Sequence, residues 1–271
     1  MRRIVLCIVS LLGFGLCSEA QTQILDPLNM PMYHARVKFL DEFFARFNGE
    51  EKRKDMPKEF SDRKSNVLML FDLSQFKSKH DSLYLEAESF AQKVAQDSIL
   101  LDYSDDRWYA KVHCFGQLAK KEVDFYLYLV VESRGADMYK WAIANAEGDI
   151  FNTSRSREHI ELFMLPNAHE QSFSSLSRVT SEDARYIDDY VKDGYEASPL
   201  SVFLTLVRSG LLQIEYTSDA EFVFFQVPNY IFTVKHFERD SMNVGWLISS
   251  ISKCEEEHKK DKKELLNAIR K

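Results

Sequence analysis

Cysteine is scarce in this sequence, with four residues among 271. Cys7 and Cys17 lie in an N-terminal segment that we expect to be removed, which leaves Cys114 and Cys254. Two cysteines can form one disulfide but no disulfide framework, and the sequence leaves their pairing open. A structural zinc site would need further ligands, such as a nearby pair of histidines, so we expect neither a metal nor another cofactor.

The signature motifs of the common catalytic classes are also missing. The chain has no glycine-rich phosphate loop, no His-Glu-x-x-His pair, no Gly-x-Ser-x-Gly elbow and no Cys-x-x-Cys pair. The sequence therefore gives these classes no positive support, and it predicts no catalytic residue.

Positive charge is in deficit as well. The formal net charge is -7, and removal of residues 1–20, which carry Arg2, Arg3 and Glu19, makes it -8. An acidic surface repels phosphate groups, so we expect neither nucleic acid nor an anionic membrane as a partner.

Long hydrophobic runs are absent, because none reaches the ~20 residues that a transmembrane helix needs. The run from Ile4 to Leu16 follows Arg2 and Arg3 and is itself followed by small residues. This three-part pattern is typical of a secretory signal peptide over residues 1–20. It predicts an exported protein, periplasmic or extracellular, with no transmembrane segment after the leader is removed.

Apolar and aromatic residues, by contrast, are plentiful. Hydrophobic residues make up 45% and aromatic residues 13% of the chain, which excludes wholesale disorder and allows a substantial core. The chain beyond residue 20 exceeds the ~100 to 200 residues typical of one domain, so one large domain or two small ones would fit.

The first half of the chain predicts two helices followed by four strands. Apolar residues at helical spacing mark helices over 37–47, ended by Gly49, and over 83–94, with Ser82 as its N-cap. Charged residues over 49–65 indicate a solvated connector. Strand-like runs cover 99–103, 108–117, 123–131 and 138–146, and the short turns between them imply antiparallel neighbours.

The second half repeats this order. Helices are predicted over 180–191 and 198–210, and strands over 211–216, 221–227, 230–237 and 245–252. A shift of 113 positions places residues 101–104 over 214–217, and the order of strands places Trp141 over Trp246. We therefore expect an α+β fold in which helices pack on curved antiparallel sheets. Two similar lobes would span 21–150 and 151–254, followed by a charged tail over 255–271.

Helices followed by a meander of antiparallel strands, the last of which bears a tryptophan, resemble the NTF2-like and cystatin-like α+β folds. The resemblance is carried by residues 39–48, 102–115, 123–132 and 139–148, with a fainter echo in 215–227 and 245–252. The chain looks like one of the exported NTF2-like proteins of unassigned function. In such folds a curved sheet wraps a helix and can leave a cone-shaped pocket, and enzymes among them often hold an acid/base pair in the cone. No motif of this sequence matches such a pair.

Strand alternation singles out Lys111 and His113 as candidate ligand-binding residues. Both point away from the apolar stripe of the strand over 108–117, so they lie on a wetter face of the sheet. His113 is the best candidate for a general base, and Asp102 or Asp124 could orient it from a neighbouring strand. The alternative, which we favour, is that His113 and Lys111 only cover a half-solvated face.

Three aromatic residues complete the candidate site. Tyr126 and Tyr128 lie opposite the apolar positions of the strand over 123–131, and with Lys111 and His113 they would form a patch that receives a partner protein. Trp141 could line a cavity for a small ligand, although a large aromatic residue in a strand is more often part of the core.

Two functions follow from these patterns. We favour an exported, non-catalytic binding or protein-interaction module of the cell envelope, whose partner is an unknown protein or small molecule. The alternative is a small-molecule hydrolase or isomerase that uses an acid/base pair inside an NTF2-like cone. An enclosed cavity with His113 and a carboxylate in hydrogen-bond reach would favour the enzyme.

We predict that the leader is cleaved after Ala20, because Ser18 and Ala20 are the small residues that signal peptidases require and polar sequence follows. Mass spectrometry of the exported protein would then find Gln21 at its N-terminus. A lipid on Cys17 would contradict the prediction, although Leu16 is bulky where a small residue usually precedes a lipidated cysteine.

Overall fold

The computed structural model describes residues 35–37, 39–50, 62–135, 138–152, 176–181, 187, 190–192, 195, 197–239, 243–255 and 259. The predicted leader, most of the predicted helix over 180–191, and the tail beyond 255 apart from Lys259 lie outside these residues. The described chain has the expected α+β character, with helices packed on an antiparallel sheet. Within this part of the chain, no helix is long and apolar enough to cross a bilayer.

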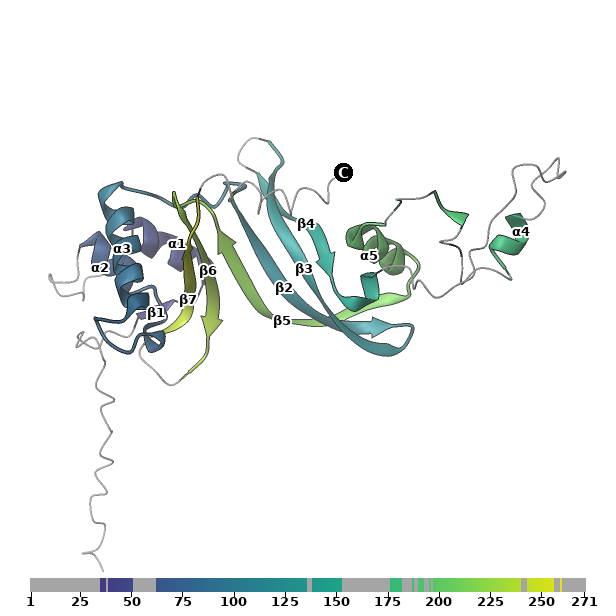
Figure 1. Cartoon of the computed structure of the whole chain (residues 1–271), viewed down its shortest axis with the longest axis horizontal. Helices are drawn as coiled ribbons and strands as arrows, with labels where there is room; N and C mark the ends of the chain where they lie inside the picture. Colours follow the sequence, from purple (N-terminus) through teal and green to yellow (C-terminus); the bar gives the residue numbers. More distant parts are fainter. Residues whose placement is uncertain are drawn as a thin grey trace, which may run out of the picture.

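The seven strands of the described chain form one sheet in the order β1-β7-β6-β5-β2-β3-β4 (Figure 1). They are β1 Ala35–Val37, β2 Trp108–Leu118, β3 Lys121–Ser133, β4 Tyr139–Glu147, β5 Leu212–Phe224, β6 Tyr230–Phe237 and β7 Asn243–Lys253. Strands β2 to β7 pair antiparallel, whereas β1 runs parallel to β7. No pattern in the sequence marks β1, because three residues are too few to show alternation.

In the described residues, five α-helices and the two short 3-10 helices η2 and η3 accompany the sheet. They are α1 Leu40–Asn48, α2 Arg63–Leu68, α3 Ser82–Gln96, α4 Leu176–Val179, α5 Pro199–Arg208, η2 Leu73–Gln75 and η3 Asp149–Phe151. Helices α1, α3 and α5 were predicted from their amphipathic spacing. Helix α2 begins within the predicted connector and extends past its end. It was missed because six residues with two buried side chains give no clear periodicity.

Local capping explains where the main helices begin and end. Helix α1 stops at Gly49, whose φ of 74° lies in the left-handed region that glycine tolerates best. Asp81, not the predicted Ser82, caps α3, since its carboxylate accepts a hydrogen bond from the backbone of the first turn. Ser198 caps α5 through its hydroxyl, and Pro199 occupies the first helical position, where no backbone donor is needed.

The strand predicted over 99–103 is wrong, because this segment is irregular. Two amide side chains make the backbone hydrogen bonds that a neighbouring strand would otherwise make. Asn48 accepts from the Leu101 N–H at 2.8 Å and donates to the Leu101 carbonyl at 2.9 Å. Gln226 does the same for Asp102, at 2.7 and 2.9 Å. The backbone is thus satisfied without a sheet partner.

The two strands predicted over 211–216 and 221–227 are one strand, β5. Residues 217–220 resemble a turn in sequence, but β2 pairs across them. Between Ser218, opposite His113, and Glu221, opposite Lys111, β5 holds one residue more than β2. A β-bulge, with Asp219 at a φ of 45°, absorbs this extra residue and keeps the strand continuous.

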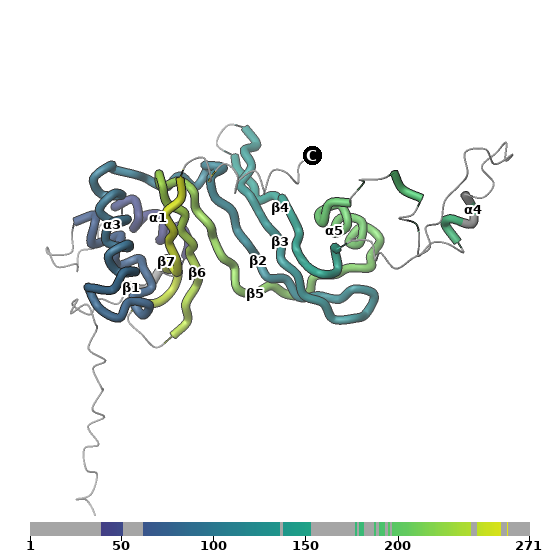
Figure 2. The backbone as a smooth tube through the Cα atoms, viewed as in Figure 1, coloured from purple at the N-terminus to yellow at the C-terminus, as the bar shows by residue number. Residues whose placement is uncertain are grey.

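Strands from both halves of the chain lie in this single sheet, so the structure does not show the two lobes predicted over 21–150 and 151–254. The block β2-β3-β4 and the block β5-β6-β7 lie side by side, joined where β2 pairs with β5 (Figure 2). Each block is covered by helices from the other half of the chain. Helices α1, α2 and α3 pack chiefly on β5 to β7, whereas α5 packs on β2 to β4. Either half alone would leave an apolar face uncovered.

The two blocks share an order of elements, but the best-matched segments of the predicted repeat do not occupy equivalent positions. Each block is a three-stranded meander preceded by a helix, and its third strand carries Trp141 or Trp246 near the start. Residues 101–104, however, form the loop before β2, whereas residues 214–217 lie inside β5. The match between these two segments is therefore not a structural equivalence.

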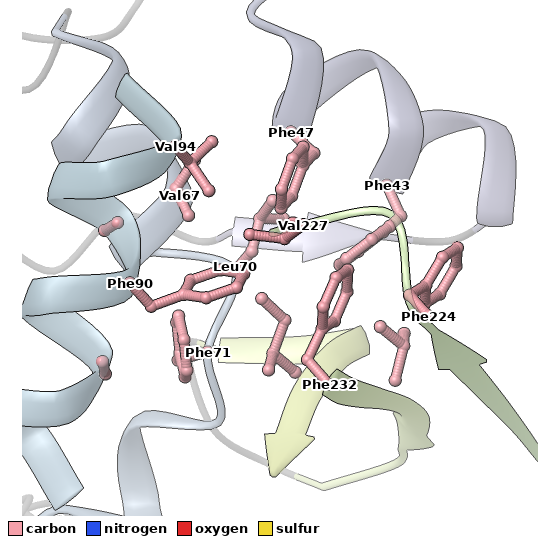
Figure 3. Close-up of a cluster of buried hydrophobic side chains, with 14 of the residues drawn as sticks. Phe43, Phe47, Val67, Leu70, Phe71, Phe90, Val94, Phe224, Val227 and Phe232 are labelled. Carbon is pink, nitrogen blue, oxygen red and sulfur yellow. The ribbon is translucent and has the colours of Figure 1, made fainter. Parts of the chain in front are cut away.

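The larger core lies between α1, α2, α3 and the sheet, and phenylalanine is its most frequent residue (Figure 3). Phe224 stacks on Trp108, with centroids 5.2 Å apart and planes 5° from parallel, and on Phe232 at 4.8 Å. Phe47 of α1 stacks on Phe232 at 5.9 Å. Each fully buried ring contributes about 1.5–3 kcal/mol through burial, so this cluster holds the helices on the sheet.

A smaller core lies under α5 and joins Phe203 of that helix to Phe125, Phe151 and Cys114. Cys114 is buried there as a free thiol, and Cys254, which follows β7, is also a free thiol. The two cysteines whose pairing the sequence left open therefore form no disulfide in this structure.

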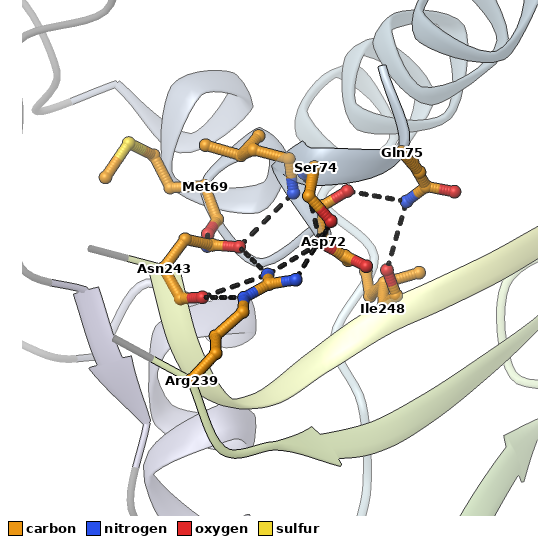
Figure 4. Close-up of polar contacts among 8 residues, drawn as sticks. Met69, Asp72, Ser74, Gln75, Arg239, Asn243 and Ile248 are labelled. Atoms are coloured by element: carbon orange, nitrogen blue, oxygen red, sulfur yellow. Dashed lines mark hydrogen bonds and ion pairs between the residues drawn. The ribbon is translucent and has the colours of Figure 1, made fainter. Parts of the chain in front are cut away.

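A polar cluster fastens the connection between β6 and β7 to the segment that follows α2 (Figure 4). Arg239 Nη2 lies 2.6 Å from Asp72 Oδ1 and 3.0 Å from the Asn243 carbonyl oxygen, while Arg239 Nη1 donates to Ser74 Oγ at 2.9 Å. The Asn243 amide donates to the Met69 carbonyl at 3.1 Å. The Asp72 side chain is only 12% exposed, so this ion pair is screened little by water.

We predict that Arg239→Ala lowers the free energy of unfolding by about 2–3 kcal/mol, because it leaves the Asp72 carboxylate buried without its main partner. Lys93→Ala is the matched control. Its partner Asp97 is 53% exposed, and we expect a loss below about 0.5 kcal/mol from this pair. Urea denaturation of both variants measures the difference, and equal losses would contradict a structural role for the cluster.

Candidate functional site

One face of strands β4, β3, β2 and β5 is not covered by any helix that the structure describes. Along β2, Trp108 points into the larger core and Cys114 into the smaller one, so both helix groups lie on the same side of this strand. The odd-numbered residues of β2, which alternate with these, point to the opposite side of the sheet. We call this other side the open face. Its side chains are Tyr109, Lys111, His113, Phe115, Gln117, Glu122, Asp124, Tyr126, Tyr128, Glu147, Glu215, Tyr216 and Glu221.

Four rings form an aromatic row across three strands of the open face: Tyr216 of β5, Phe115 and His113 of β2, and Tyr126 of β3. The ring centroids of Tyr216 and Phe115 are 4.7 Å apart with planes 9° from parallel. Those of Phe115 and His113 are 4.2 Å apart, and those of His113 and Tyr126 are 4.5 Å apart at 18°. The rings therefore cover one another's inner faces and hold the row in one arrangement.

Lys111 closes the row beside Tyr126. Its Nζ atom lies 4.2 Å from the centroid of the Tyr126 ring and 5.3 Å from that of Tyr128. The same Nζ is 3.2 Å from Glu147 Oε2, which also accepts a hydrogen bond from the Tyr128 hydroxyl. Lys111 thus combines cation–π contacts with an ion pair, and both restrict its side chain.

These contacts fix the charge of each group at neutral pH. Burial, followed by the hydrogen bond to Glu147, raises the pKa of Tyr128 to about 12, so its hydroxyl stays a neutral donor. The Tyr128 hydroxyl and then Lys111 hold the pKa of Glu147 below its usual value. Burial alone would lower the pKa of Lys111, but its contacts with Tyr128 and Glu147 outweigh burial and raise it. Tyr128 is thus a neutral phenol that contacts a charged carboxylate, Glu147, and a charged ammonium group, Lys111.

His113 meets one of the two carboxylates proposed to orient it. Its Nε2 atom lies 2.9 Å from Asp124 Oδ2. The Asp124 side chain is 63% exposed and that of His113 is 18% exposed, so the pair is open to water on one side. Asp102 lies in the loop before β2, where its side chain accepts hydrogen bonds from Ser104 and takes no part in this site.

The structure separates Trp141 from the other four candidates. Trp141 lies opposite Val131 in the pairing of β4 with β3, on the side that carries the helices. Its ring is 4.9 Å from Trp108, and it is 37% exposed at the border of the larger core. Lys111, His113, Tyr126 and Tyr128 share the open face, whereas Trp141 belongs to the opposite one.

Two central members of the site, Glu147 and Tyr216, were not found from the sequence. Glu147 reaches Tyr128 because a bulge in the pairing of β3 with β4 shifts the register between Tyr128 and Leu129. Tyr216 reaches Phe115 because β5 pairs with β2, a contact between distant parts of the chain. Alternation within one strand shows neither the bulge nor the pairing.

A shallow pocket of about 450 Å³ lies away from the open face, lined by Lys93, Asn229, Tyr230, Lys253, Cys254 and Glu255. It mixes both signs of charge and includes neither a histidine nor any predicted site residue. In the part of the chain that the structure covers, no cluster of three or more His, Cys, Asp or Glu side chains is placed to hold a metal ion.

Comparison of the chain with protein-family models, with curated proteins and with solved structures finds no match. The NTF2-like and cystatin-like resemblance accordingly stays an expectation that rests on the order of helices and strands. Function has to be inferred from the residues of the open face themselves.

We predict that Glu147→Gln destabilises the protein at pH 7 and destabilises it less at pH 3. The folded-state pKa of Glu147 is depressed, so its contribution is present above the usual carboxyl value of about 4.3 and is lost as the pH falls through the folded-state pKa. Because this side chain is 53% exposed, solvent screening limits the expected loss at pH 7 to below about 1 kcal/mol.

Glu132→Gln is the control for this prediction, because Glu132 also pairs with a lysine across β3 and β4, with its Oε2 atom 3.4 Å from Lys140 Nζ. We expect a smaller effect from it at both pH values. Chemical denaturation at the two pH values measures both variants. A loss in Glu147→Gln that does not change with pH would show that its charge is not what stabilises the site.

Proposed function

We propose that this protein is an exported, non-catalytic binding module of the cell envelope and that a partner protein docks on its open face. The observation that carries the proposal is the position of Lys111, His113, Tyr126 and Tyr128, which share a face that no described helix covers. The signal-peptide pattern of residues 1–20 supports export.

The side chains of the open face are fixed before any partner arrives. Lys111 is held by Glu147, and Tyr126 stacks on His113, which is itself bonded to Asp124. Ordering a flexible side chain at an interface costs about 0.5–1.5 kcal/mol, so contacts made in advance reduce the cost of binding. Tyrosine-rich surfaces of this kind are enriched at protein interfaces because they offer large area and few rotatable bonds.

The shape of the site favours a protein partner over a small molecule. Small-molecule sites are usually enclosed and bury most of the ligand. The aromatic row instead runs across β5, β2 and β3, and its outermost ring, Tyr216, is 59% exposed. An extended surface with exposed rings and paired charges matches what a second protein surface covers.

A hydrolase or isomerase is the second candidate, and the hydrogen bond of His113 to Asp124 favours it. Such a pair holds one ring tautomer and leaves the other nitrogen to accept a proton. The pair lies on the open face rather than within a cone, since the larger core is filled by phenylalanine rings. Binding therefore remains our first proposal.

We also infer that the chain arose by duplication of a helix and a three-stranded meander, as the proposed two-lobed NTF2-like or cystatin-like architecture implies. The common element order of the two blocks and the tryptophan in each third strand support this. The exchange of helices between the blocks explains how two such units merge into one sheet.

A photo-crosslinking amino acid at position 216 tests the binding proposal, with position 100 as the control. Tyr216 is 59% exposed on the open face, whereas Leu100 is 57% exposed after α3. In the exported fraction of the producing cell we expect discrete adducts from position 216 alone. Excess unlabelled wild-type protein should compete for them, and a Phe115→Ala/Tyr216→Ala variant should not. Identical adducts at both positions, or none at 216, would contradict the proposal.

A further inference from the structure

The aromatic row has two ends, and within the described residues a cation closes only the Tyr126 end. At the Tyr126 end, Lys111 lies over the ring and pairs with the carboxylate of Glu147. At the other end, Tyr216 also has a carboxylate beside it, that of Glu215. Among the described residues, no lysine or arginine lies over the Tyr216 ring or pairs with Glu215. Both ends therefore place a carboxylate beside a tyrosine ring, and in the described chain a cation occupies only the Tyr126 end.

The charges of the open face are unbalanced in the same direction. Lys111, the one lysine among the open-face side chains, pairs with Glu147, and Glu221 pairs with Lys235 of β6. Three further carboxylates remain, those of Glu122, Asp124 and Glu215. In the described chain they bond only to neutral or titratable groups, such as Gln117, which donates to Glu215 at 2.8 Å, and His113.

These three carboxylates flank Phe115 and Gln117 of β2, and one of them, Glu215, lies beside Tyr216. Glu122 lies opposite Gln117, and Asp124 lies opposite Phe115, in the pairing of β3 with β2. Glu215 precedes Tyr216 in β5 and reaches Gln117 from the other side. Three carboxylates and two partly exposed rings thus lie on the open face near the end of the β2–β3 hairpin, where Lys120 and Lys121 also lie.

We propose that this end of the open face docks a basic segment of the partner protein, with arginine side chains that stack on Tyr216 and pair with the surrounding carboxylates. The proposal rests on the protein-docking function argued above and names the chemistry of the partner. An arginine there would take the place that Lys111 takes at Tyr126. Arginine suits the site because its planar guanidinium stacks on aromatic rings and binds carboxylates with two parallel hydrogen bonds.

The same charges argue against other ligands. Phosphate-bearing partners such as nucleic acid or an anionic membrane would be repelled by the three carboxylates. A metal ion would need ligands that converge on one point, and the described residues contain no such cluster. A basic peptide is the ligand class that satisfies both the carboxylates and the exposed rings.

Fluorescence anisotropy with a labelled peptide of alternating arginine and serine tests the proposal on the full chain. The control peptide carries citrulline, which has the shape of arginine without its charge. We expect the arginine peptide to bind and the citrulline peptide to bind at least about tenfold more weakly. The Glu122→Gln/Asp124→Asn/Glu215→Gln variant should lower the affinity for the arginine peptide about tenfold, because each exposed ion pair contributes modestly.

A matched variant separates this site from general attraction to an acidic protein. Asp41→Asn/Glu50→Gln/Glu238→Gln also removes three negative charges, but at exposed positions away from the open face. We expect it to change the affinity less than about twofold. Equal weakening by both triple variants, or equal binding of both peptides, would overturn the proposal. Thermal melting confirms that each variant is folded, and Tyr216→Ala, which keeps every carboxylate, should also weaken binding.

The crosslinking experiment separates failure of this inference from failure of the docking function. The Glu122→Gln/Asp124→Asn/Glu215→Gln variant is the open-face triple variant. If adducts at position 216 form and this variant abolishes them, the basic-partner proposal is supported. If they form and persist in that variant, a partner docks there but its basic charge is not what is recognised, and this proposal fails. If no adducts form at position 216, the docking function itself fails, and the basic-partner proposal fails with it.

Discussion

Strand β2 lies beside β5 along its whole length, from the Trp108–Phe224 pair to the Leu118–Leu212 pair. This contact brings distant parts of the chain together and places both meanders in one sheet. At its first end, Trp108 and Phe224 stack in the larger core, and at its other end Leu212 enters the smaller core under α5. Without the pairing, each meander would lack the helix that covers it, because the covering helix is supplied by the other half of the chain.

The open face is a consequence of the same arrangement. Because both helix groups pack on one side of β2, the other side is left with Lys111, His113 and the rings next to them. The β2–β5 pairing also brings Tyr216 onto Phe115 and so extends the aromatic row into a third strand. A surface this polar and aromatic tolerates water yet still offers apolar area to a partner, which a face of leucine or valine would not do without risk of aggregation.

Charge is distributed unevenly over the open face. Lys111 and Glu221 are held in ion pairs with Glu147 and Lys235, and the remaining carboxylates, those of Glu122, Asp124 and Glu215, lie toward the end of the β2–β3 hairpin. The chain as a whole is acidic, with a formal net charge of -7, so long-range attraction and the local carboxylates favour the same class of partner. Steering by net charge speeds association, whereas the fixed rings and carboxylates decide which side chains fit.

Alternation along β2 and β3 was enough to place Lys111, His113, Tyr126 and Tyr128 on one face, because the side-chain period of a strand is a local property. The helices α1, α3 and α5 followed from their apolar spacing for the same reason. Local patterns failed where distant groups decided the structure. Asn48 and Gln226 satisfy residues 101–102 without a strand, a bulge keeps β5 continuous across a turn-like sequence, and Trp141 packs on Trp108 rather than joining the site. Glu147 and Tyr216 entered the site only through register and strand pairing, which depend on contacts between segments far apart in the chain.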